Sequence, residues 1–208
     1  MTPRKTLTVR AIVTMLCLVV LVFMPVAQAG ARTRLADRNG VALQPATSAH
    51  GADQASKAYV LYELGFIECP VCSPIELTSF FDLTMVWNKG ISYGLLPADS
   101  PWQMWLLIAF SLGMSLVLSW WLLRAQSRWL ALGLGLVVGG ALGNVIDRFR
   151  FGAVADFFHF HAFGKSWYVF NVADAAIVMG VVAILIDALF IGRPKAAGEV
   201  EGLSDDAR

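Results

Sequence analysis

The sequence has little charge: only 15% of its 208 residues are Asp, Glu, Lys or Arg. A soluble globular domain carries about 25% charged residues, so this content argues against an ordinary soluble protein. The net charge is only +1. It leaves no strong field to attract a polyanion, and we expect no nucleic-acid partner. Three cysteines are too few to build a disulfide framework.

What the sequence has instead is a hydrophobic fraction of 57%, gathered into blocks. A helix needs about 20 consecutive apolar residues to cross a bilayer. Four runs come close to this length, at residues 11–29, 102–123, 129–146 and 172–191. They predict an all-α membrane bundle of four transmembrane helices, with residues 1–10 before it and a polar tail at 192–208.

The first apolar run has two interpretations. Its basic leader and its Ala27-Gln28-Ala29 ending are typical of a cleaved signal peptide. The later spans, however, need an inserted helix that starts with the N-terminus inside. We therefore favour retention of residues 11–29 as a membrane helix.

Basic residues assign the sides of the membrane. Because cytoplasmic loops carry an excess of Lys and Arg, both termini are expected in the cytoplasm, and residues 31–101 and 147–171 outside it. The basic residues flank alternate ends of the four runs, at Arg4, Lys5 and Arg10, at Arg124 and Arg128, and at Arg193 and Lys195.

Residues 30–52 are polar and are predicted to form a loop or flexible insert. After them, Asp53 and Lys57 are four residues apart on a predicted helix along the surface. The two can pair on one helical face, and a solvated pair worth a few tenths of a kcal/mol is the favoured interpretation.

Short β-prone runs predict a small extracytoplasmic sheet. Phe80 to Leu96 holds two such runs around the turn sequence Asn88-Lys89-Gly90. Residues 153–170 are polar and aromatic, with the alternation of a strand.

Neither of two metal-like motifs predicts a metal site. Cys69-Pro-Val-Cys72 supplies two ligands where a structural zinc takes four, so a local disulfide is the alternative. His159 and His161 alternate on one strand face, and the sequence shows no acidic partner at ligand spacing. We expect no metal ion and no cofactor.

The third apolar run carries a glycine at every fourth position from Gly135 to Gly143, a stripe that lets another helix approach closely. Asn144 and Asp147 follow near its outer end. Arg148 can neutralise Asp147, and this pair is interpreted as architectural.

Asp156 and Asp174 both lie in apolar sequence at the same membrane face. Asn171 and Asp174 are spaced as a helix cap, an equally weighted interpretation of Asp174 alone. Capping does not explain a second aspartate in apolar surroundings. Two carboxyl groups close together in a low dielectric share one proton, so that one can act as base and the other as acid on a water molecule.

The same carboxylates could instead form the proton relay of a transporter or channel. A relay predicts acidic residues spread through the membrane depth, whereas the acids here cluster at one end and only Asp187 lies near the other. A non-catalytic scaffold would leave two desolvated aspartates unexplained. We therefore favour a hydrolase.

Five motifs in order resemble the lipoprotein signal peptidase (signal peptidase II) family, membrane aspartic proteases of bacteria. In that family the first of these motifs, which begins at Asp53 in this sequence, ordinarily follows the first membrane helix almost directly. Here residues 30–52 intervene between the two. The resemblance covers Asp53 to about Asp187, in the blocks Asp53-Gln-Ala-Ser-Lys57, Val86-Trp-Asn-Lys-Gly-Ile-Ser-Tyr-Gly94, Gly139-Gly-Ala-Leu-Gly-Asn-Val-Ile-Asp-Arg148, Val154-Ala-Asp-Phe157 and Phe170-Asn-Val-Ala-Asp174.

The resemblance implies cleavage of prolipoproteins just before a cysteine that carries a diacylglyceryl group, by a peptidase core at residues 53–191. It implies a β-cradle above the bundle and a bacterial inner-membrane location with the active site at the outer face. We expect a monomer in contact with membrane lipid. The family's catalytic aspartates match Asp156 and Asp174. Its supporting or substrate-binding positions match Asn88, Asn144, Asp147, Arg148 and Asn171, with Asp53 and Lys57 nearby.

Overall fold

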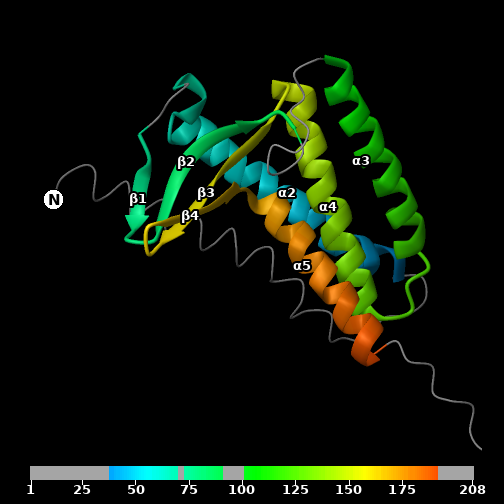
Figure 1. Ribbon diagram of the computed structural model, residues 1–208. Coiled ribbons are helices and arrows are strands. Elements are labelled where there is room, and N and C mark those ends of the chain that lie inside the picture. Colours follow the sequence, from blue (N-terminus) through cyan, green and yellow to red (C-terminus); the bar gives the residue numbers. More distant parts are fainter. Residues whose placement is uncertain (1–37, 70–72, 91–100, 192–208) are drawn as a thin grey trace, which may run out of the picture.

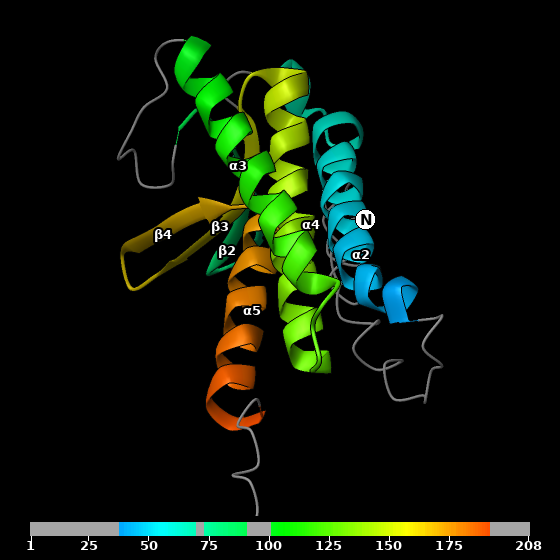
Figure 2. The same ribbon diagram turned by 90° about the vertical axis from the view of Figure 1, so that its right-hand side faces the viewer.

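The computed structural model describes residues 38–69, 73–90 and 101–191. The helices form a bundle, and a sheet projects from one end of it (Figures 1 and 2). In chain order the elements are α2 (Arg38–Ala58), η2 (Tyr59–Glu63), η3 (Phe66–Glu68), β1 (Ile75–Thr78), β2 (Phe81–Asn88), α3 (Pro101–Leu122), α4 (Arg128–Phe151), β3 (Val154–Ala162), β4 (Lys165–Phe170), α5 (Val172–Ile186) and η5 (Asp187–Ile191).

Three of the four predicted spans are confirmed as helices that are long and apolar enough to cross a membrane: Trp102–Leu122, Arg128–Phe151 and Val172–Ile191. Helix α4 continues past its predicted end at Ile146. It stops where Gly152 adopts a left-handed φ of 73° and donates its N–H to the carbonyl of Arg148 at 3.0 Å. The predicted first span, residues 11–29, and the segments 1–10 and 192–208 lie outside the described residues.

Helix α4 lies at the centre of the bundle and contacts α2, α3 and α5 (Figure 2). The predicted glycine stripe is confirmed at the close contact with α2, and Gly133, which lies outside that stripe, allows the close approach of α5. A Cβ added at Gly139 would lie 2.9 Å from the Cβ of Ala49 in α2, and one at Gly133 would lie 2.7 Å from the carbonyl O of Gly180 in α5. Larger residues at these positions would force the helices apart.

The prediction of a loop or flexible insert is wrong for residues 38–52, which form most of α2. The segment has few long apolar side chains, so it shows no strong apolar stripe. It packs through small residues instead: Ala46, Ala49 and Ala52 are buried, and Pro45 fits against Gly135 of α4. The polar composition of this segment therefore gave no indication of a helix, although the helix packs closely against the glycines of α4.

The four strands form an antiparallel sheet in the order β1-β2-β3-β4. The predicted strands at Phe80 to Trp87 and within residues 153–170 are confirmed as β2, β3 and β4. The predicted turn sequence Asn88-Lys89-Gly90 lies at the end of β2, whose neighbours in the sheet are β1 and β3. The second run of that prediction, residues 91–96, and Cys72 of the predicted disulfide alternative lie outside the described residues.

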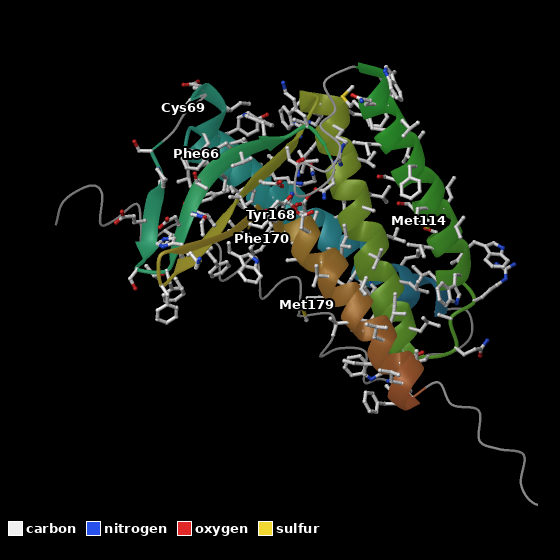
Figure 3. All side chains as sticks on the ribbon, viewed as in Figure 1. Phe66, Cys69, Met114, Tyr168, Phe170 and Met179 are labelled. Carbon is white, nitrogen blue, oxygen red and sulfur yellow. The ribbon has the colours of Figure 1, made fainter. Side chains whose placement is uncertain are left out.

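One apolar core joins the sheet to the helices. Its buried members come from α2, η2, η3, α4, α5, β2 and β3, and include Ala52, Leu136, Ala176, Leu83 and Phe157. Full burial of a Leu or Phe side chain contributes about 1.5–3 kcal/mol, so the sheet is held firmly on the end of the bundle. Figure 3 shows Tyr168 and Phe170 of β4 beside the start of α5, where strand and helix meet.

Candidate active site

Asp156 lies within β3, opposite Val86 of β2, and only 1% of its surface is exposed. Both of its carboxylate oxygens accept hydrogen bonds from asparagine amides. Asn171 Nδ2 donates to Oδ1 at 2.6 Å and Asn88 Nδ2 donates to Oδ2 at 3.0 Å. The sheet and the start of α5 thus hold this carboxyl group from two sides.

Asp174 lies in the first turn of α5, and the predicted cap at this position is confirmed. Asn171 Oδ1 accepts the N–H of Asp174 at 3.0 Å, and Oδ2 of Asp174 accepts the N–H of Asn171 at 3.2 Å, a complete capping box. Capping occupies only one carboxylate oxygen. The other, Oδ1, accepts a hydrogen bond from Asn144 Nδ2 of α4 at 2.9 Å.

Asn171 connects the two aspartates. Its side-chain amide donates to Asp156, and its backbone N–H donates to Asp174. The same amide also donates to Asn144 Oδ1 at 3.1 Å. Asn171 is fully buried, so it links both carboxyl groups through hydrogen bonds that solvent does not replace.

Burial and, to a smaller extent, the nearby carboxyl group of Asp174 raise the pKa of Asp156 to about 7. The hydrogen bonds from Asn88 and Asn171 oppose this shift because they stabilise the ionised form. The pKa therefore falls close to neutral pH, where a carboxyl group can both accept and donate a proton.

Lys57 is a buried cation at the centre of a second part of the site. Its Nζ lies 2.8 Å from Oδ2 of Asp53 and 2.8 Å from Oδ2 of Asp147, and donates to Asn144 Oδ1 at 3.2 Å. The prediction of a solvated surface pair is therefore wrong, since both side chains of the Asp53–Lys57 pair are at most 3% exposed. Asp53 also accepts the N–H of Ala173 at 3.0 Å, which joins α2 to α5.

The predicted pairing of Asp147 with Arg148 is wrong. Adjacent residues on a helix point in different directions, and these two have different partners. Asp147 pairs with Lys57 and accepts the N–H of Ala155 at 3.1 Å. Arg148 donates instead to the carbonyls of Asn144 at 3.3 Å and Gly90 at 3.1 Å.

The structure brings all nine predicted site residues into one network of polar contacts: Asp53, Lys57, Asn88, Asn144, Asp147, Arg148, Asp156, Asn171 and Asp174. Two further members were missed. Gln54 donates to Asp147 Oδ1 at 3.3 Å, and Asn88 donates to the hydroxyl of Tyr168 at 3.2 Å. Gln54 lies inside the first motif and could have been considered, whereas nothing in the alternation of β4 distinguishes Tyr168.

The expectation that His159 and His161 have no acidic partner is also wrong. Asp82 of β2 stands directly opposite His159 of β3, and Asp82, His159 and His161 form a group with metal-ligand spacing. The partner comes from a distant part of the sequence, and only the strand register reveals it.

The arrangement of apolar helices with a small sheet at one end is similar to that of solved bacterial membrane enzymes. A solved bacterial membrane enzyme matches with a TM-score of 0.65 at 25% identity, covering 78% of this chain and 95% of that chain. A second solved bacterial membrane enzyme matches with a TM-score of 0.61 at 25% identity, covering 73% and 94% of the two chains.

Comparison with curated relatives and with a family model identifies the family of this chain. The lipoprotein signal peptidase of Methylorubrum extorquens is 52% identical over 137 residues, 66% of this chain and 78% of the relative. That of Methylobacterium radiotolerans is 50% identical over 151 residues, 72% of this chain and 86% of the relative. The family described as signal peptidase (SPase) II matches residues 46–190. The chain belongs to the signal peptidase II family.

Proposed function

We propose that this chain is a membrane aspartic endopeptidase that removes the signal peptide from diacylglyceryl-modified prolipoproteins, cutting just before the lipidated cysteine. The observation that carries the mechanism is the linkage of Asp156 and Asp174 through Asn171. Membership of the signal peptidase II family and the name of its curated relatives support the substrate class.

In the proposed reaction the two carboxyl groups share one proton at neutral pH. The ionised carboxylate takes a proton from a water molecule as the water oxygen attacks the scissile carbonyl carbon. The protonated carboxyl group gives its proton to the carbonyl oxygen, which produces a neutral tetrahedral diol. The carboxyl group that took the water proton then gives it to the amide nitrogen, while the other carboxylate takes a proton from a hydroxyl of the diol. The C–N bond breaks, a carboxylic acid and a free amine are released, and the pair again holds one proton. Because the titrations are coupled, acid and base are assigned to the pair.

The remaining polar residues act by positioning in this proposal. Asn88, Asn144 and Asn171 occupy carboxylate oxygens of the two aspartates, and this fixes the rotamers of both. Lys57 holds Asp53 and Asp147 together, which ties α2 to α4. Rigid support of this kind matters because displacement of catalytic groups by about 1 Å can cost roughly 100-fold in rate.

The location of the site suits a lipidated substrate. Asp174 begins an apolar helix long enough to cross a bilayer, so the aspartate pair belongs at one membrane interface. A diacylglyceryl chain partitions into the bilayer and brings its cysteine to that depth. We infer an inner-membrane protein with both termini in the cytoplasm and the active site at the outer face.

The alternative, a proton-coupled transporter or channel subunit, is less well supported. Between Asp174 and Asp187 the sequence of α5 has no ionisable residue. Among the described residues, the buried carboxylates Asp53, Asp147 and Asp156 gather at the sheet end of the bundle and Asp82 lies on the sheet. Of the buried carboxylates in the described ranges, only Asp187 lies at the far end of α5. A relay needs groups spaced through the membrane depth.

Incubation of the purified protein with a diacylglyceryl-modified prolipoprotein and its unmodified counterpart tests the proposal. We expect cleavage only of the modified substrate, with the lipidated cysteine at the new N-terminus by mass spectrometry. Glu76→Gln, an exposed carboxyl on β1, serves as a control that keeps activity. Equal cleavage of both substrates, or cleavage at another bond, would contradict the proposed specificity.

A further inference from the structure

A second cluster of titratable side chains lies on the sheet, outside the network of the two aspartates. Asp82 of β2 stands opposite His159 of β3, and His161 follows two residues later on the same face of β3. Asp82 Oδ2 lies 3.6 Å from His159 Nδ1 and 2.8 Å from His161 Nε2. The three candidate ligand atoms all lie within 4.8 Å of one another.

Two buried polar atoms of this cluster have no hydrogen-bond partner among the described residues. The side chain of Asp82 is only 11% exposed, yet its Oδ1 is buried without a hydrogen-bond partner. His161 Nε2 lies close to Asp82 Oδ2 but is also without a partner in hydrogen-bond geometry. A buried carboxylate that lacks partners costs free energy, and a bound cation would remove that cost.

The orientation of His159 fits metal ligation. Its Nε2 is 2.5 Å from the hydroxyl oxygen of Ser166 on β4, which leaves Nδ1 to face Asp82. Metal-ligating histidines generally use their second ring nitrogen in this way, because the outer hydrogen bond fixes the tautomer and the ring orientation. When Nε2 donates to Ser166, Nδ1 carries the lone pair and faces the same point as the other two ligand atoms.

We propose that Asp82, His159 and His161 bind one divalent transition-metal ion, with Zn²⁺ the preferred occupant. Two imidazole nitrogens and one carboxylate oxygen suit Zn²⁺ and its neighbours, whereas Mg²⁺ and Ca²⁺ prefer oxygen ligands alone. Zn²⁺ takes four ligands at about 2.0–2.2 Å. Three come from these side chains, and the two histidines are exposed enough, at 19% and 35%, to leave the fourth position to water.

The neighbouring charge supports a cation at this point. Glu76 of β1 stands opposite Asp82 in the strand register, so a row of Glu76, Asp82 and His159 crosses three strands. Glu76 is exposed, and its carboxylate adds negative potential beside the ligands.

A bound ion would join β2 to β3 close to Asp156, which lies three residues before His159 on the same strand. The β2–β3 register shifts between Leu83 and Val86, so this part of the strand pair has irregular backbone pairing. An ion that binds only the folded sheet stabilises it by mass action. The proposed role is structural, and it does not rest on the proposed peptidase activity.

The test uses the full chain without a polyhistidine tag, stripped with a chelator and purified in detergent. We expect one Co²⁺ per chain, detected by visible absorption typical of nitrogen and oxygen ligation, and displacement of the Co²⁺ by Zn²⁺. Asp82→Asn, His159→Ala and His161→Ala should each weaken Zn²⁺ binding by at least about tenfold. The third histidine provides a matched control, and His50→Gln should bind as the unmodified chain does.

Two results would overturn the proposal: failure of the folded chain to bind one equivalent of Zn²⁺ or Co²⁺, or unchanged affinity in all three cluster variants. X-ray absorption of the Zn²⁺-loaded unmodified chain covers the case of variants that do not fold. The spectrum should contain two imidazole ligands, and fewer than two would also overturn the site. Asp156→Asn should retain the metal even though it loses the proposed peptidase activity, which separates the two proposals.

Discussion

Asn171 donates its side-chain N–H to Oδ1 of Asp156 at 2.6 Å across the junction of β3 and α5. The same residue is the N-cap of α5 and accepts the N–H of Asp174. One buried asparagine therefore starts the helix that carries one aspartate and holds the carboxyl group of the other. Comparison with a variant of another helix cap can separate the capping role of Asn171 from its role in positioning the carboxyl group.

We predict that Asn171→Ala lowers cleavage of a lipidated prolipoprotein by at least about 100-fold, because Asp156 loses a direct hydrogen bond and Asn144, which holds Asp174, loses the amide that positions it. Loss of the cap should also reduce stability by about 0.5–2 kcal/mol. Ser127→Ala is the matched control, since Ser127 caps α4 by accepting the N–H of Trp129 far from the aspartates. It should lower the melting temperature but leave the turnover rate intact, and equal loss of rate in both variants would argue against a positioning role for Asn171.

The raised pKa of Asp156 predicts a pH dependence of stability with a defined sign. Between the ordinary aspartate value of 3.8 and about 7, the folded protein keeps a proton that the unfolded chain has lost. The free energy of unfolding should therefore fall as pH rises through this window. Across this window, from about pH 4 to about pH 7, melting temperatures in detergent should fall more steeply with rising pH for the unmodified protein than for Asp156→Asn. Parallel curves would show that Asp156 does not titrate there.

Activity should fall above about pH 7 for the same reason, because the pair then loses its shared proton. The turnover rate at saturating substrate, measured as a function of pH, detects the loss of this proton. A rate that stays constant well into the alkaline range would contradict a requirement for one protonated carboxyl group.

Lys57→Met should destabilise the fold by about 3–5 kcal/mol, because it leaves Asp53 and Asp147 buried without their shared cation. The yield of monodisperse protein and its melting temperature measure this loss. Lys165→Met, at an exposed position on β4, is the control and should have little effect. Adding Asp53→Asn to the Lys57 variant should recover part of the stability, and no recovery would mean that charge burial is not the cause.

Gly139→Leu should prevent correct packing of α2 on α4, because even a Cβ at this position meets the backbone of Ala46. Gly113→Leu on α3 is the matched control, since nothing lies within 4 Å of a Cβ added there. Size-exclusion profiles should show loss of folded protein for the first substitution only. Normal folding of Gly139→Leu would contradict the close approach of α2.

The sequence predicted features that local patterns decide. Apolar runs of bilayer length identified α3, α4 and α5, and the spacing of Asn171 and Asp174 identified a cap, because both depend on residues close in the chain. The first part of α2, residues 38–52, was missed because it packs through alanines rather than through a long apolar stripe, whereas the helix predicted around Asp53 and Lys57 is confirmed.

Features that depend on long-range register could not be predicted in the same way. Lys57 was expected at the surface because its second carboxylate partner, Asp147, comes from another helix. The acidic neighbour of His159 was missed because Asp82 reaches it only through the pairing of β2 with β3.

The most direct test of the proposed mechanism is single-turnover cleavage of a diacylglyceryl-modified prolipoprotein by purified Asp156→Asn and Asp174→Asn variants, each shown to be folded and monodisperse. Both substitutions remove a carboxyl group and keep a hydrogen-bonding side chain of nearly the same shape. We predict that each lowers the rate by at least about 100-fold. Cleavage at an undiminished rate by either folded variant would contradict the aspartate pair as the catalytic centre.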